Sequence, residues 1–414
     1  MAKPYTISGI DIGNHQVKVA IAKMNGEGLK SEIIGAGSSS SNGLRRGVIV
    51  DMEETIENVR TAVQKAEAMS GTTIKRAYLA VSGLHINTQT SRGVIAVSRA
   101  DNEISQSDID RVIKAASVVS LPPNREIIHV IPKNFVIDGA EYVKNPLGMK
   151  GVRLEADVTI IDGLSPYLRN IVKCVNANNI EVAGLVYAPL ASAMAVFDKN
   201  QKEYGAINID FGGGTSSLTV FEEADMLHSA ILPIGSRHIT NDLAVLLRTS
   251  LDVAEKIKLE YGSTSEAEDL RRRGEIDLSQ LVGEDNFVIP KKQLVRVIDA
   301  RTSELFDIVA NELKKVSKNG ILPAGVVLSG GGVNLPGLAI LAKERLKLPV
   351  KIAKSVHFEG IAEIVDDPAF FVPMGLVMWG IDQELSGRGG KSQGMSSSDD
   401  FIKKLAGWFK NFLP

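Results

Sequence analysis

One pattern occurs twice in the chain, about 199 residues apart, and it limits the possible folds more than any other feature. Each copy is an apolar strand that ends in Asp-x-Gly, then a tight turn and a second alternating strand. The copies are YTISGIDIGNHQVKVAIAKM (5–24) and YGAINIDFGGGTSSLTVFEEA (204–224). Each is followed by a third strand and a helical pattern, the latter at 51–70 and at 236–247. A duplicated β-meander with helices predicts an α/β protein with two related lobes.

Length and composition narrow the class of protein. A chain of 414 residues is expected to divide into two to four subdomains. The net charge of −2 argues against a nucleic-acid partner, since domains that bind nucleic acid are normally basic. The one cysteine, Cys174, allows no internal disulfide and suits a reducing cytosol.

The two Asp-x-Gly turns have a possible chemical role. Glycine turns let backbone N–H groups approach phosphate oxygens. Asp11 and Asp210 end the two strands and could hold the water shell of Mg²⁺, while Lys18 could point back at a phosphate. A third turn, SGGG at 329–332, would admit a flat base or ribose close to the backbone. A single Asp-Gly turn can be purely structural, but three such turns together favour nucleotide binding.

Other motifs have simpler interpretations. The six histidines show no metal-ligand spacing, and the sequence contains no G-x-S-x-G elbow placed between a strand and a helix. GGKS at 389–392 imitates the end of a P-loop, but Leu385 stands where the first glycine should be, and no strand precedes it. The charge run Arg271–Arg273 is expected to be a solvated face.

These turns resemble those of the superfamily of actin, heat-shock chaperones and sugar kinases. Within it the chain is similar to the FtsA family of bacterial cell-division proteins, through GLRRGVIVD (43–51), AYLAVSGLHI (77–86), AEKIKLEYG (254–262), GVVLSGGGVNLPG (325–337) and DPAFFVPMGLVMWG (367–380). The block at 129–158 looks most like the family's subdomain 1C, which replaces actin's 1B. The resemblance therefore implies an actin-like ATPase fold with an FtsA-type 1C subdomain.

The resemblance also implies a division of the chain. The expected parts are 1A (1–84 with 164–195 and 360–385), 1C (85–163), 2A (196–235 with 302–359), 2B (236–301), a flexible linker (386–398) and a terminal amphipathic helix (399–414).

ATP and Mg²⁺ are the implied cofactors. The residues that match the family's nucleotide site are Asp11, Gly13, Asn14, Lys18, Asp210, Gly212, Gly213, Gly214, Thr215, Glu255, Lys258, Ser329, Gly330, Gly331, Gly332 and Asn334. Asp11 and Asp210 would hold Mg²⁺ through water. Many members have Ser or Thr at position 14 and Lys at position 16, whereas the lysine here comes at 18, as in actin. Glu255 and Lys258 lie one helical turn apart, which fits either contact with the ribose or a surface ion pair.

A protein partner is implied for subdomain 2B. In this family 2B receives the acidic C-terminal tail of FtsZ, the tubulin-like ring protein. Arg301 and Lys292 match that region and would form a cationic groove for an acidic peptide. The alternative is an ordinary solvated helix.

The last residues form an amphipathic pattern behind a Gly/Ser-rich linker. On a helix, the apolar residues of 401–413 fall within an arc of roughly 160°. They include Phe401, Ile402, Leu405, Trp408, Phe409 and Phe412, with Lys403, Lys404 and Lys410 opposite. Aromatic residues flanked by lysines are typical of a helix that lies in the headgroups of anionic lipids, and the family ends in such a helix. Packing on the protein's own core or on a partner helix is the alternative.

Together these features predict an actin-like protein that forms filaments and tethers FtsZ filaments to the cytoplasmic side of the membrane at the division site. Later division proteins would be further partners. Any ATPase activity should be slow, because no residue stands out to activate water and His15 is a candidate by position only. The alternatives are a sugar or acetate kinase, a chaperone ATPase, a rod-shape actin and a pilus-assembly scaffold.

Overall fold

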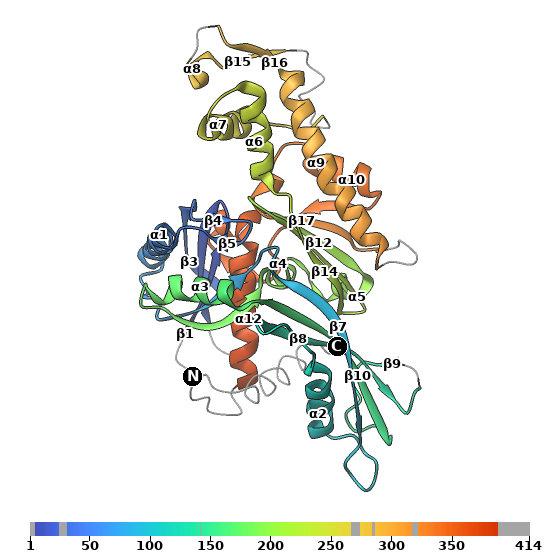
Figure 1. The fold of residues 1–414 in the computed structure, drawn as a ribbon. Helices are drawn as coiled ribbons and strands as arrows, with labels where there is room; N and C mark the ends of the chain where they lie inside the picture. The colour runs from blue at the N-terminus through green and yellow to red at the C-terminus, as the bar shows by residue number, and fades with distance from the viewer. Residues whose placement is uncertain are drawn as a thin grey trace.

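A computed structural model describes residues 5–24, 31–140, 142–265, 274–283, 286–316 and 322–387. Two sheets with their helices form the centre of the molecule, as Figure 1 shows. A smaller unit with α2 (Gln106–Ser117) and β9 (Tyr142–Val143) extends below them. A unit with α7 (Leu251–Tyr261), β15 (Glu275–Asp277) and β16 (Val288–Pro290) extends above. Within the described ranges, no helix is both long and apolar enough to cross a bilayer.

The sheet of the first lobe begins with the predicted meander. Its strand order is β11-β6-β1-β2-β3-β19. The pairs β1–β2 and β2–β3 are antiparallel, whereas β6 pairs in parallel with both β1 and β11. The strands are β1 (Tyr5–Ile12), β2 (Gln16–Met24), β3 (Ser31–Ser40), β6 (Arg76–Val81), β11 (Glu181–Tyr187) and β19 (Phe358–Gly360).

The sheet of the second lobe repeats this arrangement. Its order is β14-β13-β12-β17-β18, again an antiparallel meander followed by two parallel strands. The strands are β12 (Ala206–Phe211), β13 (Ser216–Glu222), β14 (Asp225–Leu232), β17 (Gly325–Ser329) and β18 (Val350–Ile352). The equivalent order of five strands confirms the predicted duplication and the actin-like fold.

The helices of the repeat also occupy equivalent places in the chain. Helix α1 (Met52–Ser70) begins after Asp51, whose carboxylate accepts from the N–H of Glu54, and ends at Gly71 in the left-handed region. Helix α6 (Ser236–Leu247) follows the second meander. The remaining helices of the two lobes are α3 (Ser165–Asn176), α4 (Ala188–Val196), α5 (Lys199–Tyr204), α10 (Leu338–Leu346), α11 (Ala362–Val365) and α12 (Phe371–Gly387), with 3₁₀ turns η2 (Gly331–Asn334) and η3 (Pro368–Phe370) and the small hairpin β4 (Leu44–Arg45)–β5 (Val48–Ile49).

The lower unit is a four-stranded sheet covered by one helix. It contains β7 (Asn87–Ala96), β8 (Arg125–Ile137), β9 (Tyr142–Val143), β10 (Arg153–Leu164) and α2 (Gln106–Ser117). It contacts edge strand β14 of the second lobe. Lys133 Nζ donates to the carbonyl of Leu227 at 3.1 Å, and Lys144 pairs with Asp225. This unit is where subdomain 1C is expected.

The upper unit contains α6, α7 (Leu251–Tyr261), α8 (Ser279–Val282), β15 (Glu275–Asp277), β16 (Val288–Pro290) and the first part of α9 (Lys291–Lys314). Near the C-terminus, α12 continues to Gly387. Ser386 and Gly387, which were expected in the linker, therefore belong to this helix. The run Arg271–Arg273, the motif at 389–392 and the predicted terminal helix lie outside the described residues.

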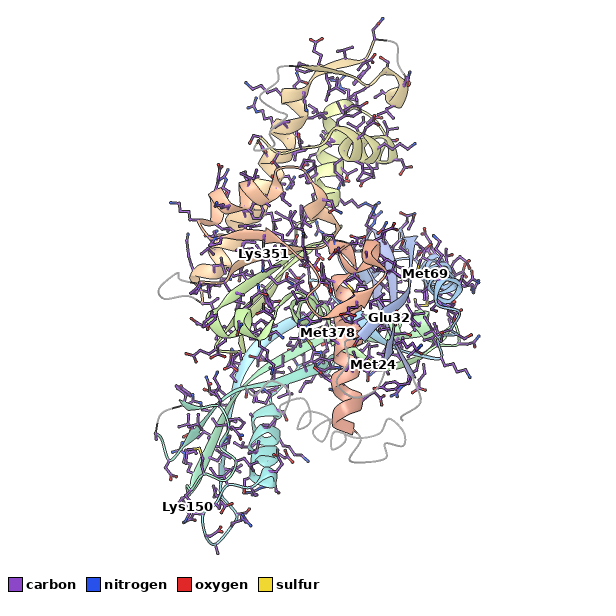
Figure 2. All side chains as sticks on the ribbon, turned by 180° about the vertical axis from the view of Figure 1, so that it is seen from behind. Met24, Glu32, Met69, Lys150, Lys351 and Met378 are labelled. Atoms are coloured by element: carbon purple, nitrogen blue, oxygen red, sulfur yellow. The ribbon has the colours of Figure 1, made fainter. Side chains whose placement is uncertain are left out.

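The lobes share a hydrophobic interior. Side chains fill the space between the layers, as the view from behind shows (Figure 2). Helix α4 packs between α12 of the first lobe and strands β12 and β13 of the second. The main core cluster accordingly includes Phe221 and Val327 of the second sheet together with residues of the first. The lobes are therefore joined by apolar packing beneath the predicted site.

Candidate functional site

The two Asp-x-Gly turns have the same local geometry. A Cβ on Gly13 would lie 2.8 Å from the carbonyl oxygen of Gln16, and one on Gly212 would lie 2.7 Å from that of Thr215. Real Cβ atoms do not approach backbone oxygens so closely, so both positions require glycine. The turns are thus equivalent in structure as well as in sequence.

The turns meet tip to tip across the two lobes. A Cβ on Gly213 would lie 2.7 Å from Cβ of His15, and one on Gly214 would lie 2.6 Å from Cγ of Asn14. Side chains of the first turn therefore rest directly on glycines of the second. A larger residue at either glycine would force the lobes apart.

Asp11, Asp210 and Lys18 form a charged group at the base of the turns. Lys18 lies opposite Asp11 in the β1–β2 register. Loss of solvent raises the pKa of Asp11 to about 6, against the charge of Lys18, and the charge of Asp210 adds to the rise. Loss of solvent also raises the pKa of Asp210, while Lys18 and the hydroxyls of Ser192 and Ser329 lower it. Two carboxylates that repel each other would gain from a cation between them.

This donor set suits Mg²⁺ better than a tightly ligated transition metal. In the described part of the chain, no group of three or more His, Cys, Asp or Glu side chains could hold a metal ion. Mg²⁺ commonly keeps several waters and uses one or two carboxylates. Asp11 and Asp210 match that need.

The second turn is fixed to the start of α6. The N–H of Ser236 donates to the carbonyl of Gly212 at 2.9 Å, and that of Arg237 donates to Gly213 at 2.8 Å. These bonds use the free N–H groups of the first helical turn. The sequence patterns do not single out Arg237, whose side chain is half-buried in this position.

Glu255 and Lys258 form an ion pair that faces α6. Their side chains are 2.7 Å apart, with exposed fractions of 23% and 10%. Lys258 Nζ also donates to Thr240 Oγ1 at 2.9 Å. Burial lowers the pKa of His15. The negative charge of Glu255 raises this pKa and the positive charge of Lys258 lowers it, so both charges are close enough to act on the imidazole. The pair is therefore not a solvated surface pair, and it lies near the first turn.

The third turn lies beside Asp210. Gly330 has a φ of 87°, in the region that favours glycine, and a Cβ there would lie 2.6 Å from Oδ1 of Asp210. Ser329 is fully buried, whereas Gly331 and Asn334 are exposed. A Cβ on Gly331 would meet nothing closer than Ala369 at 3.8 Å, so this part of the turn is open. The open space at this turn is therefore beside Gly331.

Ser192 and Asn208 lie beneath the second turn, and the sequence patterns do not single them out. The only available signal is that Ser192 is the one polar residue in APLASAMAV, the sequence of α4.

The predicted cationic groove needs a correction. Lys292 and Arg301 are both in α9, nine residues apart, which at about 100° per residue places them on opposite faces. Arg301 also has partners of its own: Nε lies 2.8 Å from Asp242 Oδ2, and Nη1 lies 2.6 Å from Glu304 Oε2. The two basic residues therefore do not line one groove.

Family models match two parts of the chain. One described as "SHS2 domain inserted in FTSA" matches residues 83–162, and one described as "Cell division protein FtsA" matches residues 207–375.

Similar proteins cover nearly the whole chain. "Cell division protein FtsA" of Pseudomonas aeruginosa is 34% identical over 408 residues, covering 97% of each chain. The protein of the same name in Bacillus subtilis is 35% identical over 371 residues, covering 89% of this chain and 82% of that protein.

Solved structures show a similar fold. The PilM–PilN type IV pilus biogenesis complex gives a TM-score of 0.65 at 16% identity, covering 91% of this chain and 98% of that one. MreB 5 of Spiroplasma citri bound to AMPPNP gives 0.54 at 14% identity, covering 93% and 98%. At these identities the likeness concerns the fold alone.

Proposed function

Because the chain belongs to the FtsA family of cell-division proteins, we propose that it binds ATP with Mg²⁺ between its lobes, forms filaments, and tethers FtsZ filaments to the cytoplasmic face of the membrane at the division site. The observation that carries the nucleotide part is the tip-to-tip meeting of two equivalent glycine turns above Asp11 and Asp210.

The residues of the site have separable roles in this proposal. Backbone N–H groups of the turns at 14–15 and 212–215 bind phosphate, and Lys18 neutralises part of its charge. Asp11 and Asp210 orient waters of Mg²⁺, which when bound offsets the charge of the phosphates. The turn at Ser329–Asn334 and the Glu255–Lys258 pair hold the nucleoside. MreB 5 of Spiroplasma citri, which has a similar fold and was solved bound to AMPPNP, adds support for a nucleotide ligand.

The nucleotide would act mainly on shape. A ligand shifts a protein toward the conformation that it binds more tightly. The residues proposed to bind the nucleotide come from both lobes, so its binding favours the arrangement in which the two turns are close. Hydrolysis is expected to be slow, with His15 as the candidate for activating water by position only. Filaments would form through repeated head-to-tail contacts, which do not close into a ring.

The proposed attachments use two separate parts of the chain. The unit that contains Arg301 would bind the acidic tail of FtsZ, and the predicted terminal helix at 399–414 would bind anionic lipid. Weak single contacts become firm when a filament presents many of them together.

Co-sedimentation tests the whole proposal. The protein should pellet with vesicles of anionic lipid in the presence of ATP and Mg²⁺, and it should bring FtsZ with it. FtsZ that stays in the supernatant while this protein pellets would rule out the tethering role. If the protein phosphorylated a small sugar or acetate at typical enzyme rates of about 1–10³ per second, a kinase function would replace the proposed tethering function.

A further inference from the structure

The lower unit belongs to the first lobe by its place in the chain, but it also binds the second lobe. The chain leaves the first-lobe sheet after β6, which ends at Val81, and returns to it at β11, which begins at Glu181. On its other side the unit contacts β14, the edge strand of the second-lobe sheet. The lower unit therefore spans the boundary between the two lobes.

Buried contacts fix the lower unit to the first lobe. His129 of β8 accepts at Nε2 a 3.0 Å hydrogen bond from the backbone N–H of Tyr187, at the end of β11. Both residues are buried, and the ring of His129 lies 4.8 Å from that of Trp379 in α12. A buried hydrogen bond and ring packing are costly to disrupt. The unit is therefore expected to move together with the first lobe.

Three side chains of the lower unit, from three separate segments, bind alternate residues of β14. The contacts are Thr88 Oγ1 to the carbonyl of Ser229 (3.2 Å), Lys133 Nζ to the carbonyl of Leu227 (3.1 Å), and the ion pair of Lys144 with Asp225. Carbonyls two residues apart point to the same edge of a strand, and an edge strand leaves them without a partner strand. We call these three contacts the β14 latch, and they use that free edge.

The β14 latch lies toward the end of the sheet that is away from the glycine turns. In the β13–β14 register, Leu232 lies opposite Ser216, directly after the second turn, whereas Asp225 lies opposite Glu222 at the other end. The residues of the latch are separate from those proposed to bind the nucleotide. A change in the latch therefore leaves the nucleotide contacts themselves intact.

We propose that the β14 latch slows the release of nucleotide by holding the lobes in the arrangement in which the two glycine turns meet. A nucleotide bound between the lobes leaves when the turns move apart, as in other enzymes whose parts close over a ligand. Because the lower unit is fixed to the first lobe, that movement shifts β14 relative to the unit and breaks the latch. This inference rests on the proposed binding of nucleotide between the lobes.

The rate at which radiolabelled ATP leaves the full-length protein tests the latch, measured by rapid filtration after adding excess unlabelled ATP with Mg²⁺. Thr88→Val together with Lys133→Met removes two donors and keeps the shape of the threonine and the aliphatic stem of the lysine. This double variant should release ATP about tenfold faster, the scale of one to two hydrogen bonds. An unchanged rate would overturn the proposal.

Lys150→Met is the matched control for loss of a lysine in the same unit. Figure 2 shows Lys150 at the far tip of the lower unit, and its side chain is exposed. The variant should change the release rate by less than about twofold. An acceleration equal to that of the double variant would overturn the latch, because it would make the effect a general one of charge.

The ion pair gives a second variant that leaves the two hydrogen bonds in place. Lys144→Glu puts like charges together and should speed the release of ATP severalfold. Adding Asp225→Lys reverses the pair and should return the rate toward that of the wild type. A rate that the second substitution does not restore would overturn the contribution of the Lys144–Asp225 contact.

A distance measurement without nucleotide separates the latch from the proposed nucleotide site. Spin labels at Val118→Cys, after α2, and at Lys351→Cys, on β18, would report the position of the lower unit relative to the second lobe. Both positions are exposed, whereas the native Cys174 is buried. The distribution of distances should be narrow in this labelled protein and broader when Thr88→Val and Lys133→Met are added.

The two measurements together decide between the outcomes. An unchanged distribution would show that the contacts do not hold the unit, and a broader distribution with unchanged release would leave the contacts only the role of covering the strand edge. Either result would overturn the proposal. A labelled protein that shows the expected distances but binds no ATP would instead refute the proposed nucleotide site, and with it the effect of the latch on release.

Discussion

The side-chain oxygen of Asn14 accepts a 3.0 Å hydrogen bond from the backbone N–H of Gly47. Gly47 has a φ of 81°, and a Cβ there would lie 2.3 Å from the carbonyl oxygen of Ser82 and 2.5 Å from Cα of Gly83. Strand β7 of the lower unit begins four residues after Gly83. Direct contacts therefore lead from the first glycine turn to the entry of that unit.

Asn14→Ala should break this connection. The N–H of Gly47 would lose its partner and should exchange faster with solvent deuterium, measured by hydrogen exchange on the unliganded protein. Asn14→Asp is the matched control, because it keeps the acceptor but places a negative charge beside the phosphates. It should leave Gly47 protected while lowering ATP affinity. Unchanged exchange at Gly47 in Asn14→Ala would contradict the role of this bond.

The sequence is sufficient to predict the elements of the fold but not the contacts between lobes. The alternation of apolar residues and the glycines of the turns predict the strands around Asp11 and Asp210, because these patterns depend only on residues close together in the chain. The bond from the N–H of Gly47 to Asn14 and the bond from Asn208 to Ser192 depend on how distant segments pack, which no local pattern records. The relation between Lys292 and Arg301, in contrast, follows from the sequence spacing. Their spacing of nine residues places them on opposite faces of any continuous helix that contains both. The structure adds that α9 is such a helix.

Asp210→Ala should abolish the Mg²⁺ dependence of ATP binding. It removes the carboxylate that would orient the metal's waters. It also relieves the repulsion that adds to the rise in the pKa of Asp11 caused mainly by burial. Asp210→Asn is the isosteric control, which keeps the shape of the turn and removes only the charge. Both variants should lose Mg²⁺-dependent affinity in a calorimetric titration. Wild-type affinity in Asp210→Ala would show that the second turn is not part of the site.

Freeing Arg301 should strengthen the binding of an acidic FtsZ tail peptide. Asp242 holds the guanidinium through two bonds, at 2.8 and 3.0 Å. Asp242→Asn removes the competing charge and should increase peptide affinity severalfold in fluorescence anisotropy, with the gain lost at high salt. Arg301→Glu should weaken binding more than Lys292→Glu, since the two side chains lie on opposite faces of α9. Equal losses would indicate a diffuse field rather than a site.

Asp225 should make stability depend on pH. Burial raises its pKa to about 6 against the opposing effect of Lys144. The folded protein then holds the proton more tightly than the unfolded chain, so the stabilisation is complete below about pH 4 and is lost as pH rises through 6. Relative to Asp225→Asn, the wild-type free energy of unfolding should fall by roughly 1–3 kcal/mol between pH 4 and 7 in urea denaturation. Glu223→Gln, at a side chain that is 75% exposed, should keep the wild-type slope. A wild-type slope in Asp225→Asn would assign the effect to another group.

The proposed membrane helix gives the most direct test of localisation, although it lies outside the described residues. Trp408 lies on the predicted apolar face, and burying such a side chain at a membrane surface contributes a few kcal/mol. Trp408→Glu replaces that contribution with the cost of placing a charge among lipid headgroups, so the protein should remain in the supernatant with anionic vesicles. Asn411→Glu adds the same charge on the predicted polar face and should reduce binding far less. ATP affinity should be unchanged in both, because none of the nucleotide-site residues lies in the helix. If Trp408→Glu still pellets with vesicles as the wild type does, the anchor lies elsewhere in the chain.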